Sequence, residues 1–229
     1  MPTATVQLAY YWLNIAGGFI LLPIITLTTI LSRRVKTQVV LINVYLIFSY
    51  ESLLACLLFL TGKYSRVEDH VLVPRIRDGD PLCMVQAILY EPTPILLSGA
   101  ALSVVLHVLI LVRSIYRSSI GEPRVNPKYV IIVPYLPYLG VVIPSLIVVL
   151  KNPAVTSPHQ MYCIVNKNFV SLLTSFIVVA MSLSSVMIQV WILIILKHEH
   201  VKVYARTSLD PSMVIRVLIF TLVQIAAVV

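Results

Sequence analysis

Charge is scarce in this 229-residue chain, since Asp, Glu, Lys and Arg make up 11% of it and hydrophobic residues 59%. Ordinary soluble domains contain about 25% charged and about 45–50% apolar residues. A soluble globule of this composition would lack the polar side chains needed to cover its surface. The shortage of charge therefore argues against a soluble domain and favours a chain that lies within a lipid bilayer.

Motifs that carry catalysis are also missing. The sequence contains no phosphate-binding glycine loop, no HExxH helix and no Gly-x-Ser-x-Gly turn. His198 and His200 are two residues apart, which does not suit shared metal binding on one helix, so we interpret KHEHVK as a loop. The basic residues are spread over short loops and form no continuous stripe for nucleic acid. We expect no enzyme activity, no cofactor, no metal site and no nucleic-acid partner.

Long apolar runs dominate what is present. Runs of about 18 or more residues fit the ~30 Å hydrocarbon layer of a membrane, whereas buried core helices are shorter. The runs should be α-helices, because open strands would leave backbone groups unpaired in lipid. The sequence therefore predicts an all-α membrane protein, one transmembrane helical domain over residues 1–229, with a bundle of six spans at about 8–31, 38–60, 82–112, 129–150, 169–196 and 213–229.

The basic residues indicate how the spans are oriented. Lys and Arg in short loops mark the cytoplasmic side. Eleven of the 17 lie after spans one, three and five or just inside span six, and the residues before span one carry no charged side chain. We therefore predict a multi-pass protein, of the plasma membrane, with its N-terminus outside and its first, third and fifth loops in the cytoplasm.

Three cysteines test this orientation. Cys56 lies inside the second span, where a single thiol usually packs as a small apolar group. Cys83 and Cys163 both fall on the predicted outer face, in an oxidising compartment where disulfides form. We expect a Cys83–Cys163 disulfide that closes a long loop and stabilises the fold by a few kcal/mol. The alternative is a pair of free or separately buried thiols.

Two carboxylates lie within the apolar runs. Glu51 and Glu91 are each nine residues from the outer end of their span, or about 14 Å deep at 1.5 Å per residue. An ionised carboxylate facing lipid costs about 2.5–3.5 kcal/mol or more, so both should face the bundle interior or be protonated. Pro92 and Pro94 remove backbone donors and leave carbonyls near Glu91 that need partners.

These features together predict a polar cavity that opens outward and binds a ligand. Besides Glu51 and Glu91, its wall is predicted to include Tyr50, Tyr90, Gln86 and Thr93. The alternative is that both glutamates are protonated groups, hydrogen-bonded to neighbours, that bind no ligand.

Two sequence segments resemble seven-transmembrane G protein-coupled receptors of mushroom-forming fungi. They are PLCMVQAILYEPTP at the start of span three and YYWLNIAGGFILLP in span one. The cysteine at the top of helix three and its partner between helices four and five resemble the same receptors. The inner end of span three, LHVLILVRSIY, has no acidic residue before Arg113, and span six has no Trp-x-Pro. The resemblance is therefore to a divergent fungal group, not to rhodopsin-like receptors.

This resemblance implies a seventh helix, an extracellular ligand and coupling to a heterotrimeric G protein. Because the chain has six spans and the last is short, we expect it to be truncated after helix six. The resemblance implies that basic residues at the inner ends of the spans face the G protein; these are His107, Arg113, Arg117, Lys202, Arg206 and Arg216. The alternative is that these charges only anchor the protein at the cytoplasmic face.

Two functions from different classes remain open. The first is a receptor that binds an outside ligand and signals through a G protein. The second is a membrane transporter or channel in which Glu51 and Glu91 are proton or cation sites. The cysteine pair and the absence of an internal repeat favour the receptor.

Overall fold

The computed structural model describes residues 4–31, 39–66, 72–74, 79–117, 127–159 and 162–198. Within these residues, five helices are long and apolar enough to cross a membrane: Thr5–Thr28, Val39–Leu60, Pro81–Arg113, Tyr129–Lys151 and Asn168–Ile195. Each begins and ends within three residues of a predicted span, so the first five predicted spans are confirmed as helices. The sixth predicted span, 213–229, lies outside the described residues.

The spans are built from several helical elements each. In chain order these are α1 (Ala4–Leu13), η1 (Asn14–Leu21), α2 (Leu22–Leu31), α3 (Val39–Leu60), α4 (Pro81–Tyr90), α5 (Thr93–Arg117), η2 (Pro127–Ile132), α6 (Tyr135–Lys151) and α7 (Asn168–His198). The first span combines α1, η1 and α2, the third combines α4 and α5, and the fourth combines η2 and α6.

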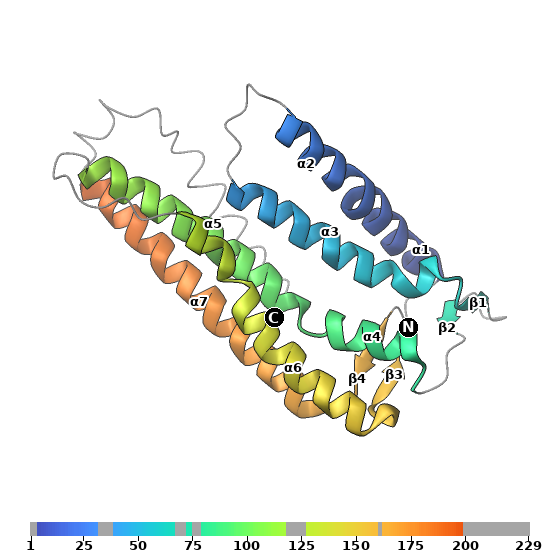
Figure 1. The fold of residues 1–229 in the computed structure, drawn as a ribbon. Helices are drawn as coiled ribbons and strands as arrows, with labels where there is room; N and C mark the ends of the chain where they lie inside the picture. The colour runs from blue at the N-terminus through green and yellow to red at the C-terminus, as the bar shows by residue number, and fades with distance from the viewer. Residues whose placement is uncertain are drawn as a thin grey trace.

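Two short β-hairpins, which the hydrophobic pattern did not predict, lie between the spans. The antiparallel strands β1 (Tyr64–Arg66) and β2 (Leu72–Pro74) follow α3. After the short η3 (Pro153–Val155), the antiparallel strands β3 (Thr156–Pro158) and β4 (Cys163–Val165) follow α6. Both hairpins lie at the end of the bundle where α1 and α4 begin (Figure 1).

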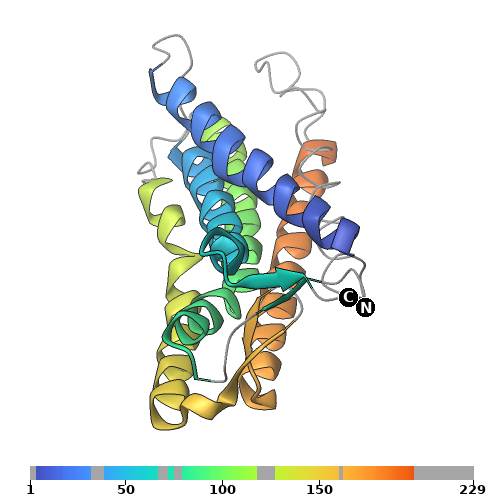
Figure 2. The ribbon, with the colours of Figure 1, turned by 90° about the vertical axis from the view of Figure 1, so that its right-hand side faces the viewer.

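The third span is the centre of the bundle. Buried residues make up 61% of its most apolar window but only 11% in the first span. Its long helix α5 packs against α3, α6 and α7. The first span lies along one side, mainly against α3 (Figure 1, Figure 2). The two termini of α5 and α7 at Arg117 and His198 lie at the end opposite the hairpins (Figure 1).

Glycines allow two close helix contacts. A Cβ on Gly99 of α5 would lie 2.5 Å from the Cα of Pro134, and one on Gly18 of η1 would lie 1.8 Å from the Oγ of Ser52. Small residues let membrane helices approach in this way. Gly18 therefore serves the packing of the first span against α3. At Gly17 an added Cβ would meet no atom within 4 Å.

The first span contains a wide turn that the sequence explains. The π-helix η1 ends two residues before Pro23, and the amide of Leu22 donates to the carbonyl of Gly17, five residues back. Proline lacks an N–H and its ring clashes with the carbonyl one turn earlier, so a wider turn ahead of Pro23 relieves that clash.

The third span is interrupted where its sequence contains Pro92 and Pro94. α4 ends at Tyr90 and α5 begins at Thr93. Pro94 has no N–H for the carbonyl of Tyr90, which instead accepts a hydrogen bond of 2.7 Å from the Thr93 hydroxyl. The predicted break is confirmed, and so is the expectation that the carbonyls beside it need partners.

Candidate ligand site at the disulfide end

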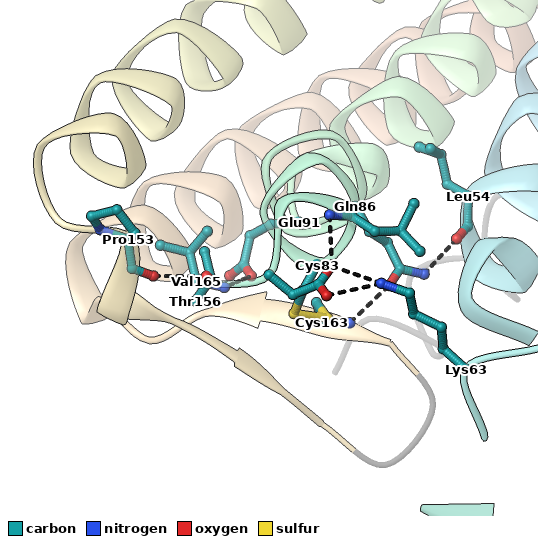
Figure 3. Close-up of a disulfide and its surroundings, with 11 residues drawn as sticks. Leu54, Lys63, Cys83, Gln86, Glu91, Pro153, Thr156, Cys163 and Val165 are labelled. Carbon is teal, nitrogen blue, oxygen red and sulfur yellow. Dashed lines mark hydrogen bonds and ion pairs between the residues drawn. A yellow bond between two sulfur atoms is a disulfide. The ribbon is translucent and has the colours of Figure 1, made fainter. Parts of the chain in front are cut away.

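The sulfur atoms of Cys83 and Cys163 are bonded, at 1.96 Å, across 80 residues of sequence, which confirms the predicted disulfide. Cys83 lies in the first turn of α4 and Cys163 begins β4, and both side chains are fully buried. Figure 3 shows the bond joining the helix to the hairpin. We call this end of the bundle, with the two hairpins and the start of α1, the disulfide end. Cys56 is a free, buried thiol, as expected.

Gln86 adds a second link at the same place. Its Nε2 donates to the carbonyl of Leu54 on α3 at 2.6 Å, and its Oε1 accepts from the backbone amide of Cys163 at 3.0 Å (Figure 3). The side chain is fully buried. Because an amide bonded at both ends holds three elements together, Gln86 has a structural role in this arrangement.

Glu91 makes the third link between α4 and the hairpin. Its Oε2 accepts a hydrogen bond of 3.3 Å from the backbone amide of Val165, and Figure 3 shows the side chain directed toward β4. The carboxylate also interacts electrostatically with the phenol of Tyr162, which lies just before the strand. One of the two predicted glutamates is thus engaged with the hairpin.

Glu51 behaves differently, although it comes from the neighbouring helix α3. It is partly buried, and among the described residues nothing forms a hydrogen bond with its carboxylate. It interacts electrostatically with the phenols of Tyr10 on α1 and Tyr90 at the end of α4. No hydrogen bond joins Glu51 to Glu91 in the described part of the chain, so the two carboxylates make different contacts.

Three tyrosines lie close to one another at this end, and two of them, Tyr10 and Tyr90, interact with Glu51. The hydroxyls of Tyr10 and Tyr90 lie 3.4 Å apart, and the rings of Tyr90 and Tyr162 have centroids 4.4 Å apart. All four side chains are partly exposed. We call Tyr10, Glu51, Tyr90 and Tyr162 the tyrosine–glutamate cluster. It draws on α1, α3, α4 and the segment before β4.

Sequence reasoning did not include Tyr10 or Tyr162 in this site. Signals for both exist in the chain: Tyr10 begins the aromatic triplet YYW near the start of the first span, and Tyr162 directly precedes Cys163. Since the disulfide fixes Cys163 over α4, its neighbour is held at the same end of the bundle.

Tyr50 and Thr93 lie beside the proline break. The hydroxyl of Tyr138 on α6 donates to the carbonyl of Leu89 at 3.0 Å, and the Tyr50 hydroxyl lies 2.9 Å from that of Tyr138. Since Tyr138 uses its proton on Leu89, Tyr50 is the donor between the two phenols. Thr93, 2% exposed, donates to the carbonyl of Tyr90. Tyr138 and Thr93 therefore satisfy carbonyls at the interrupted helix, and Tyr50 donates to Tyr138.

An ion pair lies at the start of α4. Lys63 Nζ lies 2.8 Å from Oδ2 of Asp80 and 3.0 Å from its Oδ1. Oδ1 also accepts from the amide of Leu82, which caps the helix. The hydrogen bond from Lys63 holds the pKa of Asp80 below its usual value. Burial, followed by the nearby Glu91 carboxylate, raises the pKa of the Tyr162 phenol, which therefore stays neutral.

The predicted cytoplasmic residues lie at the opposite end where they are described. Arg113 is exposed, with its guanidinium carbon 5.2 Å from the ring centroid of Trp191 on α7. His107, near the middle of α5, has a buried Nδ1 that lacks a hydrogen-bond partner within the described residues. Only the backbone of Arg117 is described, and Lys202, Arg206 and Arg216 lie outside the described residues.

A separate apolar hollow of about 460 Å³ lies on α7 near its first turns. It is lined by Phe169, Leu172, Leu173, Ser175, Phe176 and Val179. None of the predicted ligand-binding residues borders it. Exposed aromatic and aliphatic side chains of this kind suit contact with lipid chains.

Nothing in the described part of the chain groups three or more His, Cys, Asp or Glu side chains as a metal would require. No family model, curated protein or solved structure matches this chain. The cluster and the links around it are therefore the basis for a functional assignment.

Proposed function

We propose that this protein is a receptor of the plasma membrane that binds an extracellular ligand and signals through a heterotrimeric G protein. The single observation that supports this most is the tyrosine–glutamate cluster, a partly exposed polar group at the disulfide end of the bundle. In this proposal the disulfide end faces outside, as the distribution of basic residues predicts.

The hairpin β3–β4 gives the proposed site a fixed wall. Three links hold it to α4: the disulfide, Gln86 to Cys163 and Glu91 to Val165. Tyr162, which belongs to the cluster, is carried by this hairpin segment. A preorganised wall lowers the entropy that binding must overcome, which supports ligand recognition at this end.

The predicted wall residues divide into two kinds in this proposal. Glu51, Tyr90, Tyr50 and Glu91 are partly exposed and are assigned to the ligand-binding surface. Gln86 and Thr93 are buried and hydrogen-bonded, so we assign them to holding that surface in place.

The opposite end is where the G protein would bind. Arg113 is exposed there and stacks over Trp191, linking α5 to α7. Relative movement of helices at this end is an established way for a membrane receptor to open a crevice for its partner. We extend the same role to His107, Arg117, Lys202, Arg206 and Arg216, in a bundle of seven helices such as the fungal receptors that the sequence resembles.

The transporter or channel remains the second candidate because Glu51 has no hydrogen-bond partner among the described residues. An ion pathway would need a series of such sites. Glu91, the other intramembrane acid of the described spans, uses one oxygen to hold the hairpin. Because Glu91 is used in this way, the receptor is favoured over the transporter or channel.

The test is a screen for ligand-dependent G protein activation by the full chain in cells. The Glu51→Gln and Glu91→Gln variants should shift the dose–response curve of any activating ligand while surface expression stays at the wild-type level. Tyr129→Phe is the matched control, because Tyr129 is 71% exposed and remote from the cluster. Unchanged curves for both glutamate variants would contradict the proposed site, and proton-coupled uptake without G protein activation would favour the transporter.

A further inference from the structure

We infer that the ligand of the tyrosine–glutamate cluster carries a positively charged amine, held by the carboxylate of Glu51 and the aromatic faces of the tyrosines. The inference rests on the proposed function in one respect, that the cluster is a ligand site. It adds the chemical class of the ligand.

The first argument is the missing partner of Glu51. Charged side chains within membrane spans pair with opposite charges or with backbone groups. Among the described residues no cation pairs with Glu51. At the same end, Lys63 is already bound to both carboxylate oxygens of Asp80. A cation supplied from outside the protein would give Glu51 the partner that the described chain does not.

The second argument is the composition of the rest of the cluster. Glu51 interacts electrostatically with the phenols of Tyr10 and Tyr90, whose hydroxyls lie 3.4 Å apart, and the ring of Tyr162 lies 4.4 Å from that of Tyr90. Among the described residues, no basic side chain is part of the group. The face of an aromatic ring attracts an ammonium ion, and such rings together with a carboxylate form a recognised type of amine site. An anionic ligand would instead be repelled by Glu51 and by Glu91.

The third argument is the difference between the two membrane-level acids. Glu91 has a backbone donor in Val165, and its role is explained by the hairpin that it holds. Glu51 has no comparable structural task in the described residues, although replacing it with an apolar residue would relieve the cost of burying a carboxylate in lipid. A ligand cation accounts for a carboxylate at this position.

The experiment measures direct binding to the purified chain in lipid nanodiscs, with no G protein present. The probes are choline, which has a permanent positive charge, and its neutral carbon isostere 3,3-dimethylbutan-1-ol. We expect choline to bind at millimolar concentrations and the isostere to bind at least ~10-fold more weakly, because the isostere lacks the charge.

Three variants assign the binding to the cluster. Glu51→Gln should weaken choline binding by ~10-fold or more, since it removes the countercharge and keeps the size of the side chain. Tyr90→Leu should weaken it by about 5-fold through loss of the aromatic face. Asp80→Asn is the control, because it removes a carboxylate at the same end outside the cluster, and choline affinity should stay at the wild-type level.

Equal binding of choline and its isostere, or no binding of choline to the wild type, would overturn the inference. So would full choline affinity in both Glu51→Gln and Tyr90→Leu, each of which must first show wild-type thermal unfolding. A different result would contradict the proposed receptor function. Choline binding without ligand-dependent G protein activation in cells would reject the receptor and keep the amine site. Activation only by uncharged ligands would reject the amine site and keep the receptor.

Discussion

The two ends of the bundle are held together by different forces. At the disulfide end, a disulfide, two side-chain bridges to β4 and an ion pair join α3, α4 and the hairpin. At the opposite end, α5 and α7 meet through an apolar group, Val105, Val108, Val112 and Ile192, and through Arg113 stacked on Trp191. Covalent and directional bonds fix one geometry, whereas apolar contacts between membrane helices allow sliding. The difference predicts that the disulfide end is the more rigid of the two.

The largest expected effect comes from removing the covalent link. Replacing Cys83 and Cys163 together with Ala should lower the free energy of unfolding by about 2–5 kcal/mol, because the bond no longer restricts the unfolded chain. Denaturant unfolding in detergent micelles would measure this. The control is Cys56→Ala, which removes a free thiol. If the double variant loses no more stability than this control, the disulfide end is not the more strongly fixed of the two.

The opposite end is tested by truncating its apolar contact. Ile192 is 2% exposed and Ile194, on the same helix, is 61% exposed. Ile192→Ala should cost about 2 kcal/mol, near the lower limit for such truncations, since lipid and not water solvates the separated helices. Ile194→Ala should change stability by less than about 0.5 kcal/mol. Similar losses in the two variants would mean that packing between α5 and α7 does not hold this end.

The smallest effect is expected at the proline break, between the two ends. Tyr138→Phe removes the hydroxyl that serves both Leu89 and Tyr50, at about 0.6 kcal/mol for each hydrogen bond in a membrane protein, or about 1 kcal/mol in total. Tyr129→Phe, at an exposed position, should be neutral. Amide hydrogen exchange would sharpen the result, since we expect faster exchange around Leu89 and Ile95 in Tyr138→Phe. Unchanged exchange there would show that the hydroxyl does not stabilise the break.

Much of the fold follows from the sequence because long apolar helices are set by local composition. The length of each apolar run gave five spans within three residues of the helices found. The same local reasoning predicted the break at Pro92 and Pro94. The disulfide was predictable because topology and compartment limit which cysteines meet, and only three are available.

The two hairpins were not predicted, since each strand has three residues and lies between polar loop residues where periodicity gives no signal. The site was predicted only in part for a different reason. Depth along a helix placed Glu51 and Glu91 at similar levels, but depth does not determine the direction in which a side chain points or what it meets.

The sequence by itself determined the five long apolar helices, the interruption of the third at its prolines and the cysteine pair, because each depends on the length, spacing or chemistry of nearby residues. Only the tertiary structure decided that Gln86 and Glu91 hold the hairpin, while Glu51 interacts with Tyr10 and Tyr90 and forms no hydrogen bond within the described residues. The members of the tyrosine–glutamate cluster come from helices and loops up to 152 positions apart, from Tyr10 to Tyr162. Such contacts depend on the packing of whole helices, which no local pattern specifies.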